Sequence, residues 1–315
     1  MTTYKEINGT NIEAVSSDPA NPVLGQIWYN TTTNVLKGVG FNATGAWATG
    51  GNLNTARYGL GAAGNSNDSA LVFGGAPSGV TAATESYNGS SWTEVNDLNV
   101  AKYYIQGTGT QTAALALGGA PPPTGTGATE SWNGTSWTEV GDLNTGRLQV
   151  AGVGTQTAAL VFGGSPNPKA VTESWNGSSW TEVADLNTGR AALGGAGTQT
   201  AALGFGGNVS PNAQTESYNG SSWTEVNDLN TGRTGLAGAG IQTLAVAFGG
   251  YPVTGVTEEW NGSSWTEVAD LSTARESLAG TGTQASALAV GGLPLTAATE
   301  EWTGAGPIVQ TFTDS

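Results

Sequence analysis

The feature that most constrains the fold of this chain is an internal repeat with a period of about 43 residues. The copy from Thr172 to Gly207 reads TESWNGSSWTEVADLNTGRAALGGAGTQTAALGFGG, and similar copies precede and follow it. A period of this length is typical of one small supersecondary unit that buries its apolar faces only against neighbouring copies. We therefore expect the copies either to stack into a solenoid or to close into a ring.

Each copy contains the pattern of four short strands. In the copy that follows Arg190, we expect strands within AALGGAG, AALGFGG, QTESY and SWTEV. GTQT reverses the chain after the first strand, and Asn-Gly, the strongest short hairpin signal, reverses it before the fourth. Each strand then pairs with its sequence neighbour in an antiparallel meander. Packing such sheets radially around an axis buries both of their faces and leaves only short edges.

Four landmarks recur at fixed places in the repeat: a double glycine, an aromatic residue, a tryptophan and a basic residue. The double glycines are Gly74-Gly75, Gly118-Gly119, Gly163-Gly164, Gly206-Gly207, Gly249-Gly250 and Gly291-Gly292. The aromatic residues are Tyr87, Trp132, Trp175, Tyr218, Trp260 and Trp302, and the tryptophans are Trp92, Trp137, Trp180, Trp223 and Trp265. The repeat basic residues, as we call the last group, are Arg57, Lys102, Arg147, Arg190, Arg233 and Arg275.

This order of landmarks resembles the kelch repeat over roughly residues 41–304. The chain departs from that repeat in having a tight NGSS or NGTS turn where an acidic loop is usual. The resemblance implies an all-β fold, a β-propeller of four-stranded blades. The double glycines indicate six blades, with a strand around Trp47 completing the sheet begun by residues 275–302. The alternative is seven blades, in which Val35–Gly51 and Pro307–Thr313 form an incomplete one.

Composition excludes several classes of function. The chain has no Cys and no His, so it has no disulfides, lacks the usual zinc, copper and haem ligands, and lacks the commonest general base. A net charge of −15 with only nine basic residues makes nucleic-acid binding improbable on electrostatic grounds. No apolar run approaches the length of about 18 residues that spans a membrane, and the start of the chain lacks the apolar region of a signal peptide.

The residues that recur in every copy are expected to be scaffold. Tryptophan at one register position per copy favours packing between sheets over ligand binding. Each copy also has carboxylates, such as Glu173, Glu182 and Asp185, that we expect to pair with the repeat basic residues. Every such carboxylate pair is copied along the chain, whereas a catalytic pair should be singular. We therefore predict that the protein is not an enzyme and has no catalytic residues, no cofactor and no metal site.

The copies differ most in the segments between the double glycine and the third strand. In a meander these segments emerge on the same face as the connections between sheets, and they hold nine of the 12 prolines. Proline stiffens a loop and lowers the entropy lost on binding. The candidate binding residues are Pro77, Pro121, Pro122, Pro123, Pro166, Pro168, Lys169, Pro211, Asn212, Tyr251, Pro252 and Pro294. The alternative is that these loops vary because surface loops tolerate change.

The N-terminal segment lies outside the repeats. We expect a hairpin there, with strands in GQIWYN and VLKGV and a turn at TTTN. The string NPVLGQIWYNTTTNVLKG resembles segments of bacteriophage tail-fibre and virion-appendage proteins. That resemblance implies two parts, an attachment segment at residues 1–40 and the propeller at residues 41–315. Trp28 and Tyr29 are the candidate attachment residues.

These observations lead to one expected function and two alternatives. We expect a non-enzymatic component of a phage virion, either a tail fibre or a capsid or tail appendage, that presents the propeller to a host-surface glycan or protein. The N-terminal segment would bind other virion proteins, and the protein would be a homo-oligomer within the virion. The first alternative is a purely structural protein of virion assembly or decoration. The second is a glycan-active enzyme.

Overall fold

The computed structural model describes residues 12–19, 25–42, 44–120, 125–167 and 169–312. All regular structure among these residues is β-strand, as the sequence predicts, and none of them forms a helix long and apolar enough to cross a membrane. The chain divides into two compact units. The first is Met1–Gly45 with Gly304–Ser315, and the second is Ala46–Thr303.

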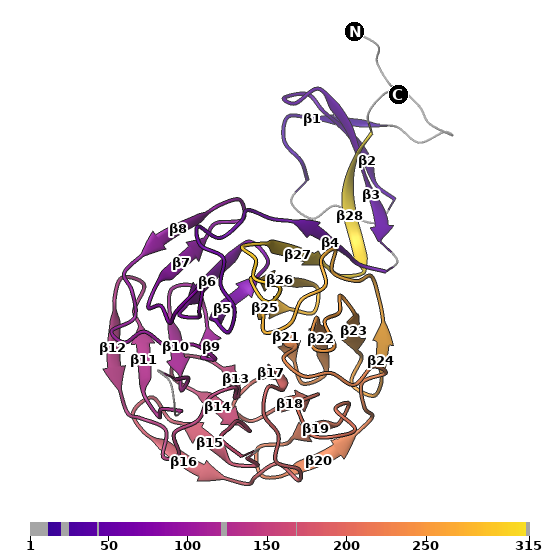
Figure 1. The fold of residues 1–315 in the computed structure, drawn as a ribbon. Helices are drawn as coiled ribbons and strands as arrows, with labels where there is room; N and C mark the ends of the chain where they lie inside the picture. The colour runs from indigo at the N-terminus through magenta and orange to yellow at the C-terminus, as the bar shows by residue number, and fades with distance from the viewer. Residues whose placement is uncertain (1–11, 20–24, 43, 121–124, 168, 313–315) are drawn as a thin grey trace. The chain divides into compact units, whose positions relative to one another are not determined.

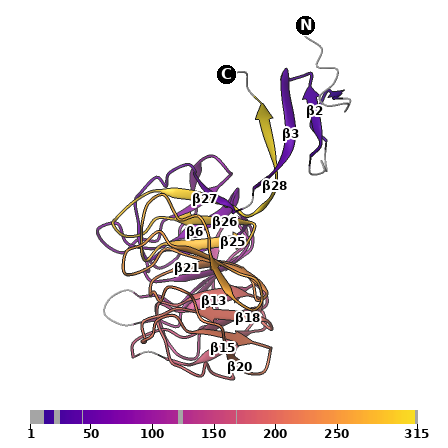
Figure 2. The same cartoon turned by 90° about the vertical axis from the view of Figure 1, so that its right-hand side faces the viewer.

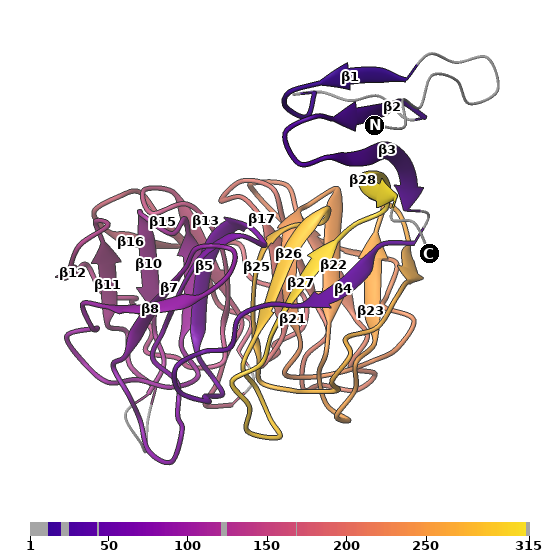
Figure 3. The same ribbon diagram turned by 90° about the horizontal axis from the view of Figure 1, so that it is seen from above.

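In the described part of the second unit, six four-stranded antiparallel sheets are arranged around one axis, as Figures 1 and 2 show. This arrangement is consistent with a β-propeller. The first strand of each sheet contacts the first strand of the next, and β25 contacts β5, so the series of sheets closes on itself. Figure 3 shows the strands crossing the thickness of the ring, with the connections emerging at its two faces.

The strands occupy the predicted places in each repeat. The first strands are β5 (Gly61–Ser66), β9 (Gln106–Gly109), β13 (Ala151–Gly154), β17 (Gly194–Gly197), β21 (Ala237–Ile241) and β25 (Ala279–Thr283). The second strands are β6 (Ser69–Phe73), β10 (Ala114–Leu117), β14 (Ala159–Phe162), β18 (Ala202–Phe205), β22 (Leu244–Phe248) and β26 (Ser286–Val290). The third strands are β7 (Thr84–Tyr87), β11 (Thr129–Trp132), β15 (Thr172–Trp175), β19 (Thr215–Tyr218), β23 (Thr257–Trp260) and β27 (Thr299–Thr303). The fourth strands are β8 (Trp92–Val95), β12 (Trp137–Val140), β16 (Trp180–Val183), β20 (Trp223–Val226), β24 (Trp265–Glu267) and β4 (Ala46–Thr49).

The last sheet is completed by a strand from the beginning of the repeat array. β4 pairs antiparallel with β27, with Trp47 opposite Trp302. This pairing confirms the predicted role of the strand around Trp47. The Trp47 indole also packs edge-on against Phe248 of the neighbouring sheet, with ring centroids 5.0 Å apart. The two ends of the array are therefore joined by backbone pairing within a sheet as well as by packing between sheets.

The core lies between successive sheets. Every residue of β14, for example, is buried, because both faces of a second strand are covered by neighbouring sheets. Trp223 packs against Phe162 of the preceding sheet at 4.8 Å, and its indole N–H donates to the Thr172 hydroxyl at 3.2 Å. The prediction that the repeated tryptophans pack between sheets is thus confirmed. Burial of one large apolar side chain contributes about 1.5–3 kcal/mol.

The double glycine has a specific steric cause. At Gly163 the backbone has a φ of 71°, and a Cβ atom there would lie 2.6 Å from the carbonyl oxygen of Arg190. Gly164 donates its N–H to the same carbonyl at 2.7 Å. Only glycine permits this close approach together with a left-handed φ. The double glycine therefore fixes the end of the second strand against the connection that leads to the next sheet.

The first unit contains a separate four-stranded sheet in the order β1-β2-β3-β28. The predicted hairpin is confirmed, with β2 (Ile27–Asn30) antiparallel to β3 (Val35–Asn42). The pairings of the two outer strands were not predicted: β1 (Glu13–Val15) pairs parallel to β2, and β28 (Gly306–Phe312) pairs antiparallel to β3. Of the strands in the seven-blade alternative, β3 and β28 lie in this sheet, whereas β4 lies in the sheet of β27. The observed boundaries differ from a division at residue 40, because the β28 pairing places the C-terminal strand with the N-terminal segment.

Candidate functional site

The proline-bearing loops and the connections between sheets emerge on the same face of the ring. Isolated β-bridges link these connections to the loops, including Tyr58 with Ala76, and Glu276 with Leu293. This confirms the geometry expected for a meander. We call this side the loop face. The opposite side, which carries the turns between first and second strands and the Asn-Gly hairpins, is the turn face.

A buried basic residue lies at the base of each variable loop; the five arginines donate to both ends of their loops, whereas Lys102 donates to one end, at Ala128. The Arg147 side chain is fully buried, and its Nη1 donates to the carbonyl oxygens of Gly163 at 2.8 Å and Val171 at 2.6 Å, which are the two ends of one loop. Its Nη2 lies 2.8 Å from Oε1 of Glu173. Among the described residues six such buried ion pairs occur: Arg57–Glu85, Lys102–Glu130, Arg147–Glu173, Arg190–Glu216, Arg233–Glu258 and Arg275–Glu300. The predicted pairing of the repeat basic residues is confirmed for the third-strand glutamates.

The same glutamate also holds the connection that precedes its sheet. Oε2 of Glu173 accepts hydrogen bonds from the backbone N–H of Asn144 at 2.7 Å and from its side-chain amide at 2.8 Å. Burial lowers the pKa of Arg147, and the charge of Glu173 opposes that shift. The variable loop and the connection beside it are thus fixed to one sheet by a single buried pair. Loops anchored in this way lose little further entropy when they bind a partner.

The structure places the predicted loop residues at or near the tips of these loops. Pro166, Pro211, Tyr251, Pro252 and Pro294 are exposed, and Pro77, Lys169 and Asn212 are half-buried. Pro121, Pro122, Pro123 and Pro168 lie outside the described residues.

Two adjacent loops of this face are unusually apolar. Tyr251 and Val253 on one loop are 55% and 44% exposed, and Leu295 on the next is 47% exposed. Exposed aromatic and aliphatic side chains on an anchored loop favour contact with a partner surface.

The predicted attachment residues of the first unit have different environments. Trp28 is fully buried and donates its indole N–H to Oδ1 of Asp18 at 3.0 Å. Asp18 also accepts from Asn30 at 2.7 Å and from Lys37 at 2.6 Å. Trp28 therefore supports its own sheet and presents no surface to a partner. Tyr29 is half-buried, and its hydroxyl donates to Oδ1 of Asn34 at 3.4 Å.

A group of residues near the centre of the loop face was not predicted. The residue two positions after each repeat basic residue has a left-handed backbone, with φ between 50° and 63°. These residues, which we call the belt, are Gly59, Tyr104, Gln149, Ala192, Gly235 and Ser277. Most belt residues donate their N–H to the carbonyl of the preceding one: Ser277 N–H donates to Gly235 at 2.8 Å, and Gly59 N–H donates to Ser277 at 2.8 Å, which joins the last repeat to the first. The link differs at Tyr104, because the N–H of Ile105 donates to the Gly59 carbonyl at 3.4 Å.

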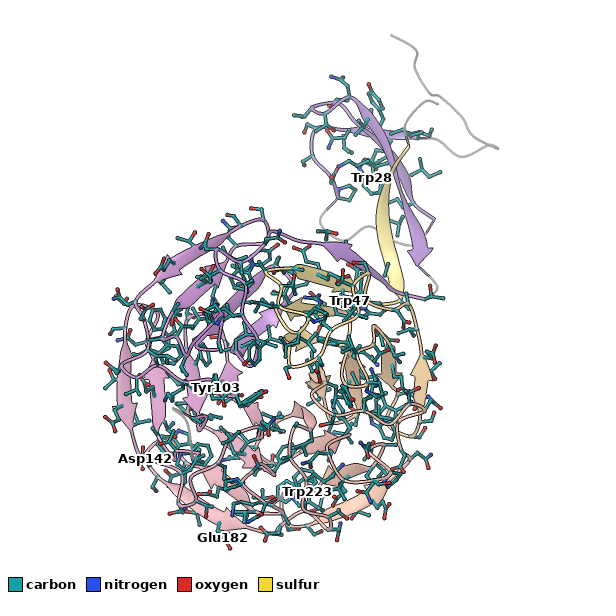
Figure 4. All side chains as sticks on the ribbon, viewed as in Figure 1. Trp28, Trp47, Tyr103, Asp142, Glu182 and Trp223 are labelled. Carbon is teal, nitrogen blue, oxygen red and sulfur yellow. The ribbon has the colours of Figure 1, made fainter. Side chains whose placement is uncertain are left out.

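Three tyrosines gather at one part of the belt. Tyr103 and Tyr104 have ring centroids 4.6 Å apart, and Tyr58 packs edge-on against them at 6.5 Å and 6.0 Å. We call these residues the tyrosine cluster. All three are half-buried, and Figure 4 shows Tyr103 at the inner side of the ring. Alignment of the copies on their basic residues would have found this cluster, because other copies have Leu148, Ala191, Thr234 and Glu276 at the position of Tyr58 and Tyr103.

The axis of the ring holds a cavity of about 270 Å³, lined by the first strands. Its walls are mainly small residues such as Gly107, Gly152 and Gly195, and the Gln106 amide donates to the Gly107 carbonyl at 2.9 Å. Within the described ranges no group of three or more acidic residues is placed to hold a metal ion. Comparison with protein-family models gave no match to this chain, and comparison with curated proteins gave none either.

Proposed function

We propose that this protein is a non-enzymatic binding component of a bacteriophage virion, in which a six-bladed, kelch-like β-propeller uses its loop face to bind a host surface. One observation carries the binding role: unlike loops on one face are each clamped by a nearly identical buried ion pair. An invariant base with variable tips is the arrangement expected of a recognition surface, because the scaffold supplies rigidity and the loops supply specificity.

The assignment to a virion rests on the resemblance of residues 21–38 to phage appendage segments. In this proposal the first unit attaches the protein to other virion proteins. Because Trp28 is buried, the attachment surface consists of residues on the outside of this sheet, such as Tyr29. The assembled form would be a homo-oligomer within the virion.

A second candidate function is structural assembly, in which the loop face binds another virion protein. The exposed apolar side chains of Tyr251, Val253 and Leu295 favour this alternative, because they match the apolar centres of protein interfaces. Glycan hydrolysis has less support. Glu173 is neutralised by Arg147, and Asp185 accepts the backbone N–H of Thr172 at 3.0 Å, so these repeated carboxylates have structural partners.

Competition for adsorption tests the proposal. Purified full-length protein is added to host cells before phage, and the fraction of adsorbed phage is measured. The loop-face variant Tyr251→Ser/Leu295→Ser is compared with the matched turn-face variant Ile241→Ser/Leu244→Ser, which changes residues of similar exposure, 49% and 48%. We expect the parent and the turn-face variant to compete equally, and the loop-face variant to need about tenfold more protein. Equal competition by all three would contradict a receptor-binding loop face.

Imaging of the virion distinguishes structural assembly from host binding. If the loop face were buried against another virion protein, assembly would be its role. A loop face open to solvent on the particle surface would favour adsorption.

A further inference from the structure

The tyrosine cluster is not required by the fold. At the position of Tyr58 and Tyr103 another copy has Ala191, and at the position of Tyr104 other copies have Gly59 and Gly235. These copies have the same left-handed backbone, and Gly59, Ala192 and Gly235 each donate an N–H to the preceding belt residue. Small residues at both positions are therefore compatible with the fold. The fold alone does not explain why three aromatic rings gather here.

The backbone conformation of Tyr104 is also unfavourable for a residue with a side chain. Its φ of 50° is left-handed, and such a residue favours the right-handed conformation. Its ring lies over Gly59, where an added Cβ atom would be 3.0 Å from Cδ1 of Tyr104. The absence of a side chain at Gly59 thus makes room for the ring of Tyr104. Gln149, Ala192 and Ser277 have the same left-handed backbone, so the conformation belongs to the belt, and Tyr104 differs from them in the aromatic ring that it places there.

The groups around the rings are polar and carry no positive charge. Burial raises the pKa of Tyr104, as do Tyr58, Tyr103 and Glu276, while a hydrogen bond with Ser277 opposes the shift. The Tyr104 hydroxyl therefore stays protonated at neutral pH and can donate a hydrogen bond. Glu276, which is half-buried, and Ser277 supply acceptors beside it. The neighbouring repeat basic residues Arg57 and Lys102 are fully buried and ion-paired.

The arrangement of the rings distinguishes between classes of ligand. Centroid separations of 4.6–6.5 Å mean that the rings pack on one another and leave no space for a cation between them. They form a half-buried group of aromatic rings with the hydroxyl of Ser277 and the carboxylate of Glu276 beside Tyr104. Such a group of rings fits the apolar C–H face of a sugar ring, whose hydroxyls then reach the surrounding donors and acceptors. An acidic sugar would face the carboxylate of Glu276 with no basic partner among the cluster residues.

We propose that the tyrosine cluster, with Glu276 and Ser277, is a binding site for a neutral carbohydrate. This inference rests on the proposed function of the loop face as a recognition surface, and it names the class of ligand. Tyr103 and Tyr104 supply the stacking surface, Tyr58 supports them from the side, and Glu276 orients sugar hydroxyls.

An oligosaccharide array followed by calorimetry tests this site. Full-length protein is applied to an array of neutral and acidic oligosaccharides, and the neutral oligosaccharide that gives the strongest signal is titrated in solution. The variants Tyr104→Gly and Tyr103→Ala introduce residues that other copies have at the same positions. We expect each to weaken binding by about tenfold or more. Leu148→Ala, at the same repeat position but outside the cluster, should stay within about twofold of the parent.

Thermal unfolding separates a ligand site from a structural cluster. Tyr104→Gly removes the left-handed strain, so its melting temperature should be no lower than that of the parent. A marked fall in melting temperature would mean that the ring serves the fold. Failure of the parent to bind any neutral oligosaccharide, or unchanged binding by both tyrosine variants, would overturn the inference.

The two proposals can fail separately. If the loop-face variant loses adsorption competition while the parent binds no neutral oligosaccharide, the carbohydrate site is wrong and the recognition role stands. If the cluster binds a neutral oligosaccharide but no loop-face change alters adsorption, the site stands and the host-binding role is wrong.

Discussion

Nη2 of Arg147 lies 2.8 Å from Oε1 of Glu173, and both side chains are completely buried. The same guanidinium holds both ends of the loop between Gly163 and Val171. One ion pair thus joins the scaffold to the most variable segment of its repeat. This relationship explains how the loops can differ in sequence while the sheets beneath them remain the same.

Breaking this pair from one side should destabilise the ring. Arg147→Met leaves the Glu173 carboxylate buried without a counter-charge, and we expect a loss of about 3–5 kcal/mol of unfolding free energy. This loss is measured by unfolding in guanidinium chloride, with tryptophan fluorescence as the signal. The double variant Arg147→Met/Glu173→Met should lose less than Arg147→Met alone, because no charge remains buried. Glu182→Ala, an exposed carboxylate on the adjacent strand, is the control.

The double glycine should tolerate no side chain. Gly163→Ala places a Cβ atom 2.6 Å from the Arg190 carbonyl oxygen at a left-handed φ, and we expect a cost of at least about 1–3 kcal/mol. Gly79→Ala is a matched control, since nothing lies within 4 Å of its added Cβ atom. Its effect should stay within about 0.5 kcal/mol in the same unfolding assay. Equal effects at both positions would refute the steric account.

Packing between sheets should depend strongly on the fourth-strand tryptophans. Trp223→Ala removes the contact with Phe162 and the hydrogen bond to Thr172, so we expect a loss of about 3–5 kcal/mol. Differential scanning calorimetry checks this, with the exposed Tyr251→Ala as a control expected within about 0.5 kcal/mol. A small effect of Trp223→Ala would mean that neighbouring side chains move to fill the cavity left by the indole.

The first unit should weaken in acid. Hydrogen bonds from Lys37, Asn30 and Trp28 lower the pKa of Asp18 from 3.8 to about 2. Because the folded state favours the carboxylate, the stabilisation is present above pH 3.8 and is lost as the pH falls through about 2.

The Trp28 indole N–H resonance should report this change in an NMR titration, with a midpoint near pH 2. The Trp223 indole, which has no carboxylate partner, serves as the internal reference. Asp18→Asn should abolish the transition at Trp28. A midpoint at the ordinary value of 3.8 would show that the hydrogen bonds do not favour the ionised form.

Most of the ring could be predicted because its signals are local and repeated. The Asn-Gly turn before Trp180 fixes one hairpin, and its copies fix the others. The pairings β1–β2 and β3–β28 were not predictable in the same way. Glu13–Val15 has no alternating pattern, and the partners of β3 and β28 are separated by almost the whole chain. The equally distant pairing of β4 with β27 was predictable because Trp47 occupies a repeat position, whereas β3 and β28 lie outside the repeat register.

The candidate site was predicted only in part, because the sequence marks the variable loops but not the belt. The variable loops stand out when the copies are compared, and the structure places Tyr251 and Pro294 at exposed tips. The belt does not stand out, because a left-handed backbone is accommodated there by residues as different as Gly235 and Gln149. The cluster of Tyr58, Tyr103 and Tyr104 forms only when two repeats meet in space.

The pairing of β4 with β27 has a consequence for how the molecule is made. During synthesis β4 leaves the ribosome before any other strand of the ring, yet its partner is the last strand of the array. The early sheets can form one at a time behind it, whereas β4 stays unpaired until translation has passed Thr303. A chain that stops inside the array leaves an open edge at each end, available for pairing with another incomplete chain. Only a chain translated past Thr303 can pair β27 with β4 and so close the ring without these open edges.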